Sequence, residues 1–203
     1  MTVNAGEYKS KIGLDNLYVA SITTDDATDY AAGTPAYLAP AAEASLEPST
    51  SFDIQYADDQ AYDVASSEGE TKVALKVTNI DLAQLATITG KVFDVATGRM
   101  FDNGGTAPYM ALSFRSKKSN GEYRYYQYLK GKFDMPKEEI ATLGEKPEPK
   151  LLELTYTAIR TTYKFDLGSI NDSVKRVVGD TDITAFDETG WFTSVQMPDK
   201  VSS

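Results

Sequence analysis

Residues 109–133 read YMALSFRSKKSNGEYRYYQYLKGKF, which is the pattern of two strands joined by a turn. Every second residue from Met110 to Phe114 is apolar, the period of a half-buried strand. A polar run, residues 116–122, interrupts the alternation, and its Asn-Gly pair tolerates the positive φ of a tight turn. An aromatic-rich run, residues 123–133, then resumes the strand pattern. We therefore predict a long antiparallel hairpin with one apolar face and several basic side chains.

The rest of the chain predicts many short strands and one helix. Asp81 is suited to cap a helix that ends at Ile88, with Gln84 in the capping-box position and Gly90 as the stop. Leu82, Leu85, Ala86 and Ile88 would be its buried side. The predicted strands span residues 16–23, 42–47, 52–56, 71–78, 92–95, 99–101, 150–160, 163–167, 174–178 and 191–195.

Two segments interrupt this series of strands. Pro48 is expected to end the strand before it, because proline cannot donate a backbone hydrogen bond. Residues 57–70 are acidic, rich in small side chains and weakly patterned, so we predict a long loop.

Short strands with one helix are typical of a mainly β fold, either a β-sandwich or a barrel with a flanking α-helix. The first residues are polar and without periodicity. We therefore expect an N-terminal arm over residues 1–12 and a single domain over residues 13–203.

The composition excludes several kinds of chemistry. The 203 residues include no Cys and no His, which removes disulfides, thiol nucleophiles and imidazole bases. No nucleotide-binding loop or nucleophile motif is present, and no apolar run is long enough to span a membrane. We predict a protein that is not an enzyme, needs no cofactor or metal, and has no membrane partner.

The charge is unevenly distributed along the chain. Residues 12–71 contain twelve Asp and Glu residues and no Lys or Arg, so the rest of a chain of net charge -10 carries +2. Opposite potentials on one molecule can draw copies of it together head to tail. A solvated acidic face that aids solubility is the simpler interpretation for an isolated domain.

Two other interpretations of the side chains are weaker. Tyrosines at 123, 125, 126 and 128 among basic residues could stack single-stranded nucleic acid, but alternating tyrosines are also ordinary cross-strand pairs, and an acidic chain opposes nucleic-acid binding. The Asp25-Asp26 and Asp58-Asp59 pairs lack the spacing of a calcium loop.

Several segments in collinear order resemble the major tail protein family of long non-contractile bacteriophage tails. The most specific block combines FRSKKSNG, YRY and KGKF of the hairpin with the GEKPE that follows it. The matching segments are GLDNLYVA (Gly13–Ala20), TPAYLAPA (Thr34–Ala41), ASLEP (Ala44–Pro48), YADD (Tyr56–Asp59), ALSFRSKKSNGEYRYY (Ala111–Tyr126), LKGKF (Leu129–Phe133), GEKPEP (Gly144–Pro149) and WFTSV (Trp191–Val195).

The resemblance implies a structural virion protein of the tail tube, assembled in the bacterial host cytoplasm. In that family, subunits form hexameric rings whose strands close a continuous ring β-barrel, and the rings stack into a tube through which the DNA passes. It implies the protein itself as the main partner, together with tape-measure, tail-tip and tail-terminator proteins. The alternative from another class is a monomeric β-sandwich that binds carbohydrate or a surface.

Position and charge suggest which residues would serve such an assembly. We expect subunit or ring contacts at Lys9, Lys11, Tyr56, Asp58, Asp59, Arg115, Lys117 and Lys118. We expect lumen-facing side chains at Glu43, Glu47 and Asp53.

Overall fold

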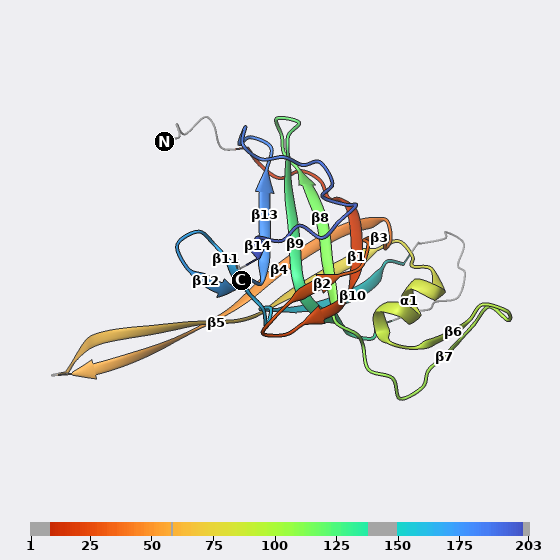
Figure 1. The fold of residues 1–203 in the computed structure, drawn as a ribbon, viewed down its shortest axis with the longest axis horizontal. Coiled ribbons are helices and arrows are strands. Elements are labelled where there is room, and N and C mark those ends of the chain that lie inside the picture. Colours follow the sequence, from red (N-terminus) through yellow and green to blue (C-terminus); the bar gives the residue numbers. More distant parts are fainter. Residues whose placement is uncertain (1–8, 58, 138–149, 201–203) are drawn as a thin grey trace.

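The computed structural model describes residues 9–57, 59–137 and 150–200. It is mainly β with one short helix, as predicted (Figure 1). The strands of the large sheet are β1 (Asp15–Asp25), β2 (Tyr30–Ala32), β3 (Ala36–Tyr37), β4 (Ala41–Ala57), β5 (Gln60–Val77), β8 (Met110–Lys117), β9 (Tyr123–Phe133), β10 (Leu152–Ile159) and β13 (Arg176–Asp180). The smaller elements are α1 (Leu82–Thr89), β6 (Val92–Asp94), β7 (Arg99–Phe101), β11 (Lys164–Asp166), β12 (Asn171–Ser173) and β14 (Asp199–Lys200).

The large sheet is antiparallel and follows the order β2-β1-β8-β9-β10-β5-β4, with β3 added beside β1. At its centre, β9 pairs with β8 along one side. On its other side β9 pairs with β13 through its first half and with β10 through its last residues. Strand β4, at one end of this order, approaches β1, the second strand from the other end, but the sheet does not close into a barrel in the single subunit.

The predicted hairpin of residues 109–133 is confirmed as β8 and β9, with Gly121 at φ 93° in its turn. The prediction of one apolar face is wrong, because both faces are buried. Leu112 belongs to the larger of two core clusters, which we call the first core and which also contains Leu85 and Ile88 of α1. Its neighbour Ala111 belongs to the second core, on the other face of the sheet. The second core contains Ala20, Tyr30, Ala111, Leu129, Tyr163, Phe165 and Val195.

Gly131 of β9 lets the Tyr156 side chain of the neighbouring strand β10 pack directly against the β9 backbone. A Cβ atom at Gly131 would lie 2.4 Å from Cζ of Tyr156. Because Gly131 has no Cβ atom, the Tyr156 side chain packs across β9, and its hydroxyl donates to the carbonyl of Met110 at 2.8 Å. The hydroxyl is therefore satisfied although the side chain is fully buried.

The helix is confirmed, and it ends at Thr89, one residue later than predicted. The Asp81 carboxylate accepts from the backbone N–H of Ala83, and Gly90 adopts φ 71° at the C-cap. Gln84 does not complete a capping box, because its amide donates to the carbonyl of Tyr37. Leu82 is 41% exposed rather than buried, whereas Leu85, Ala86 and Ile88 are buried as predicted.

The prediction of a loop over residues 57–70 is wrong. From Gln60 onward these residues form the first part of β5, and they pair with β4, which continues beyond Pro48. Pro48 is tolerated because β4 is the last strand in the sheet order and has one unpaired edge. Small Ala, Ser and Gly residues made the strand pattern weak, and pairing with β4 supplies the order that local preference does not.

The predicted strand over residues 191–195 is also wrong. Backbone N–H groups of Trp191 and Thr193 donate to carbonyls three residues earlier, so this segment is a series of turns. The Trp191 ring lies 5.5 Å from that of Tyr125 and is buried. The apolar residues here pack over the second face of the sheet instead of joining it.

Candidate assembly interface

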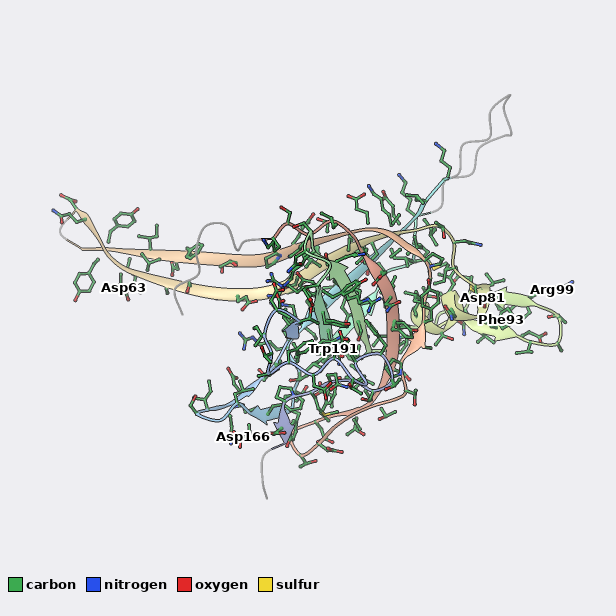
Figure 2. All side chains as sticks on the ribbon, turned by 90° about the horizontal axis from the view of Figure 1, so that it is seen from above. Asp63, Asp81, Phe93, Arg99, Asp166 and Trp191 are labelled. Atoms are coloured by element: carbon green, nitrogen blue, oxygen red, sulfur yellow. The ribbon has the colours of Figure 1, made fainter. Side chains whose placement is uncertain are left out.

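The outer half of β4 and β5 projects from the body of the molecule (Figure 1). We call residues 48–57 and 59–70 the projecting hairpin. Among the described strands, its two strands pair with each other alone, from Thr50 opposite Glu68 to Ala57 opposite Gln60. Asp59 in the turn has φ 59°, a conformation in which Asp is among the better tolerated residues. Figure 2 shows the labelled Asp63 near the far end, away from the body.

Every described side chain of the projecting hairpin is exposed, including large apolar ones. Phe52 is 67%, Tyr56 72% and Tyr62 80% exposed. Cross-strand pairs place Ile54 and Val64 on one face, which alternation extends to Phe52 and Tyr56. The opposite face carries Ser51, Asp53, Gln55, Asp63, Ala65 and Ser67. The hairpin is thus amphipathic, with an exposed apolar face.

An isolated two-stranded hairpin of this kind is at most marginally stable in water. Its free backbone edges can also pair with another chain, and a contiguous exposed apolar patch usually marks an interaction site. The face that carries Phe52 and Ile54 continues the side of β4 on which Ala44 and Leu46 pack against the first core. The projecting hairpin therefore extends a core-facing surface beyond the subunit's own core.

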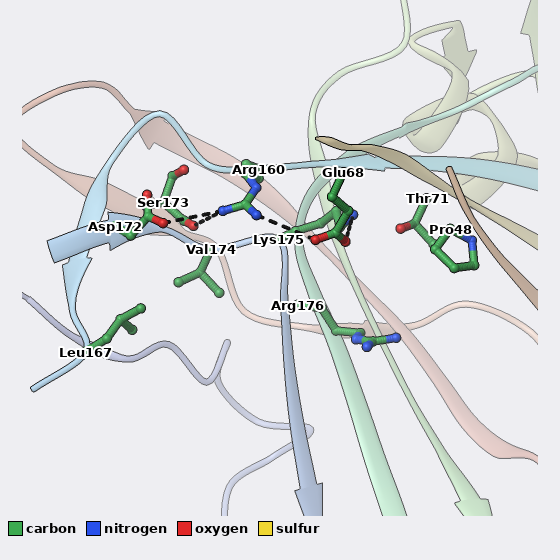
Figure 3. Close-up of a pocket in the computed structure, with 10 residues that line it drawn as sticks. All are labelled: Pro48, Glu68, Thr71, Arg160, Leu167, Asp172, Ser173, Val174, Lys175 and Arg176. Carbon is green, nitrogen blue, oxygen red and sulfur yellow. Dashed lines mark hydrogen bonds and ion pairs between the residues drawn. The ribbon is translucent and has the colours of Figure 1, made fainter. Parts of the chain in front are cut away.

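An ion-pair cluster holds the root of the projecting hairpin against the body (Figure 3). The Lys175 ammonium contacts the Glu68 carboxylate and also donates to the carbonyl of Gly69 at 3.0 Å. Arg160 lies 3.5 Å from both Glu68 and Asp172. The hydrogen bond from Lys175 and its charge keep the pKa of Glu68 below its ordinary value. These contacts fix the place where the hairpin leaves the sheet.

The structure separates the predicted contact residues into two groups. Arg115 and Lys118 are engaged within the subunit: Arg115 pairs with Asp15 at 2.6 Å, and the buried Lys118 contacts Asp180 and Asp182. Both side chains form ion pairs within the subunit. The β8–β9 turn and the strand before it therefore present fewer unpaired cations to a partner than the sequence suggests.

Other predicted contact residues lie at the surface. Lys117 is exposed, and Lys11 lies 5.1 Å from the centre of the Tyr126 ring. Tyr56 and Asp59 lie on the projecting hairpin, whereas Asp58 is outside the described residues. Lys9 is exposed and precedes the segment that bridges Lys11 to Lys118.

The predicted lumen residues share one face of β4. Glu43, Glu47 and Asp53 are exposed and separated by even numbers of residues, so alternation places them together. Glu43 pairs with Lys76 at 2.8 Å. Sequence reasoning missed the projecting hairpin itself, although the alternation of Tyr62 and Val64 was a signal for it.

The described residues bear on two further features, a metal centre and a membrane-spanning helix. Within the described ranges, no three His, Cys, Asp or Glu residues gather as metal ligands would. None of the helical residues described forms a segment of the length and apolarity needed to cross a membrane.

An open antiparallel sheet with a projecting, apolar hairpin places the chain among β proteins whose free strand edges and exposed apolar faces are suited to contact another chain. A family model described as phage tail tube protein matches residues 45–197. The chain belongs to this family: it is a structural subunit of a phage tail that self-assembles into a tube. No curated protein matches the chain.

Proposed function

We propose that the protein forms hexameric rings that stack into the tail tube of a long-tailed, non-contractile phage, and that DNA passes through the lumen. The subunits are made and assembled in the host cytoplasm, where they meet tape-measure, tail-tip and tail-terminator proteins. The ring number rests on the resemblance to the major tail protein family. The observation that carries self-assembly is the apolar face of the projecting hairpin, which continues the core-facing side of β4.

The proposed lumen wall is the exposed side of β4, β5 and β10. Alternation gives this face small and charged residues, and the C-terminal segments that form the second core pack over the other half of the sheet. The face carries Glu43, Ser45, Glu47, Lys72, Ala74, Lys76, Glu153, Thr155 and Thr157. The acidic residues repel phosphate, and the lysines shorten the range of that repulsion, so DNA slides without sticking.

The ring interface follows from the open sheet. An interface between different surfaces of identical subunits closes into a ring or continues as a filament. Pairing of free strand edges between copies satisfies backbone groups that one subunit leaves open. The assembly surface is therefore the unpaired edge of β4 together with the projecting hairpin.

The size of the tag-free protein at rising concentration tests this function. We expect species far larger than the 22.2 kDa subunit, and hollow tubes with six-fold end views by negative-stain electron microscopy. A chain that stays a single subunit at high concentration, even when it is offered tail tips, contradicts the proposal. Tubes with another symmetry would correct the ring number alone.

A further inference from the structure

A groove lies where the two ends of the sheet meet. Strand β4 pairs with β5 on one side, and none of the described strands pairs with its other edge. Beside that edge, the structure holds a groove of about 330 Å³, which we call the seam groove. Its lining includes Lys11, Leu14, Ala44, Leu46, Phe114 and Tyr126.

The seam groove is mainly apolar. Phe114 and Tyr126 stack at its floor, with ring centres 5.1 Å apart. Leu14 and Leu46 form its walls and stay half-buried. Covering these side chains removes further apolar surface from water, which favours binding by roughly 25 cal/mol per Å² buried. An apolar occupant therefore stabilises the groove, and a polar one does not.

The subunit's own projecting hairpin cannot be that occupant. Leu46 and Ile54 lie eight residues apart on the continuous strand β4, which corresponds to roughly 27 Å along an extended chain. The strand carries Ile54 away from the groove that contains Leu46. Any contact between these two side chains must therefore join different copies.

The projecting hairpin of a second copy matches the seam groove in chemistry. Its exposed apolar face offers Phe52 and Ile54, and its edges are free to pair with β4. The described part of the hairpin carries acids and no Lys or Arg. Lys11 lines the groove, and the backbone N–H of the exposed Lys117 donates to the carbonyl of Gly13, which belongs to the same lining. Opposite charges steer the approach and fix its direction.

We infer that the projecting hairpin of one subunit docks into the seam groove of another, with Phe52 and Ile54 against Leu14, Leu46 and Phe114, and a hairpin strand beside the free edge of β4. This docking rests on the proposed tube function and names the surface that receives the hairpin. Each copy is both donor and acceptor, so the contact propagates.

Disulfide trapping tests the docking, and the absence of natural Cys makes it clean. The pair Leu46→Cys and Ile54→Cys in one chain cannot bridge internally, because a disulfide needs Cα atoms about 4.4–6.8 Å apart. We expect oxidised tubes of this variant to give a ladder of covalent dimers and higher species on a non-reducing gel. The ladder should collapse to the monomer on reduction.

The matched control moves one cysteine to the other face of the same strand. Ser45 neighbours Leu46 but belongs to the polar face of β4, so Ser45→Cys with Ile54→Cys should give at least ten-fold less cross-linking. If Leu46→Cys prevents folding or tube growth, Leu14→Cys with Ile54→Cys probes the other wall. Tubes without a ladder from either groove pair, or with equal ladders from the control, overturn the docking while leaving the tube function intact. A wild-type chain that makes no tubes contradicts the tube function and, with it, the docking.

Discussion

Lys118 shows how charge is used for folding at the level of single residues. Its ammonium is buried beside Asp180 and Asp182, and Arg124 also contacts Asp180. Burial alone disfavours the ammonium, yet the two carboxylates raise the pKa of Lys118 above its ordinary value. The cluster ties the β8–β9 turn to the end of β13 at Asp180 and to Asp182 just after it.

Removal of Lys118 should therefore be costly. Lys118→Ala removes one of the two cations that contact the buried Asp180 and leaves Arg124 and the backbone N–H of Asp182 as its partners. We expect a loss of about 3 kcal/mol in the free energy of unfolding, the low end for breaking a buried pair. Urea denaturation measures this. The adjacent, exposed Lys117→Ala serves as the control and should change the value by less than about 0.5 kcal/mol. Equal effects of the two substitutions would show that the cluster adds no stability.

Acid should weaken the fold through two buried carboxylates. Burial acts to raise the pKa of Asp25 and Asp180, but hydrogen bonds outweigh it: from Lys130 and backbone N–H groups at Asp25, and from Lys118 and Arg124 at Asp180. Both pKa values consequently lie below the ordinary value of 3.8. A carboxylate with a lowered pKa in the folded state stabilises above its unfolded value and loses that contribution as pH falls through the folded value.

We therefore expect the Tm to be nearly constant from pH 7 to about pH 5, and to fall below about pH 4 as these carboxylates gain protons. Thermal unfolding followed by circular dichroism across this range provides the measurement. Asp180→Asn should lower the Tm at pH 7 and make the acid decline shallower. A variant that keeps the full decline would assign the acid sensitivity to other groups.

At the level of elements, the sequence predicted those whose local signals agree with their tertiary partners. The Asp81 cap and the Gly90 C-cap define the ends of α1 through neighbouring residues alone. The alternation of apolar residues in β8 predicted a strand correctly because the polar run after it clearly marks the turn. The outer part of β5 was missed because its order comes from pairing with β4, which local composition does not reveal. The turns after Glu188 were missed because Trp191 and Phe192, the apolar residues that pack on Tyr125, give this segment the composition of a strand.

The residues predicted for the candidate interface also show what local sequence can and cannot reveal. Charge and position alone pointed to Tyr56 and Asp59, which the structure places on the projecting hairpin. They also pointed to Arg115 and Lys118, whose partners Asp15 and Asp180 lie far away in the sequence. Such long-range pairing is decided by the fold, so no local pattern could show that these cations are already engaged.

The projecting hairpin should be dispensable for folding and necessary for assembly. Replacing residues 51–67 by Asn-Gly keeps the pair of Thr50 with Glu68 and therefore the ion pairs at the root. Because the described side chains that the deletion removes are exposed, we expect a Tm within a few degrees of the wild type and a complete loss of tube growth. Calorimetry and electron microscopy measure the two properties. Normal tubes from the shortened chain would contradict an assembly role for the hairpin.

At the level of the whole molecule, uneven charge gives the subunit a direction. The acidic portion of residues 12–71 includes the projecting hairpin, and the lysines at the seam groove belong to the more basic remainder. Exposed ion pairs are individually weak, at most about 1 kcal/mol each. In a tube every subunit repeats them, so a small change per contact shifts the concentration at which tubes grow.

Charge reversal at the seam groove should therefore impede growth without unfolding the subunit. For Lys11→Glu with Lys117→Glu, we expect the critical concentration for tube growth to rise about 5- to 30-fold, which corresponds to one or two kcal/mol. Sedimentation at low salt measures it, because salt screens such contacts. Adding Asp53→Lys and Asp63→Lys to the hairpin restores opposite charges and should recover most of the loss. If the four-fold variant assembles no better than the double variant, the lysines and the hairpin do not meet, and the attraction that orients the copies must come from another pair of surfaces.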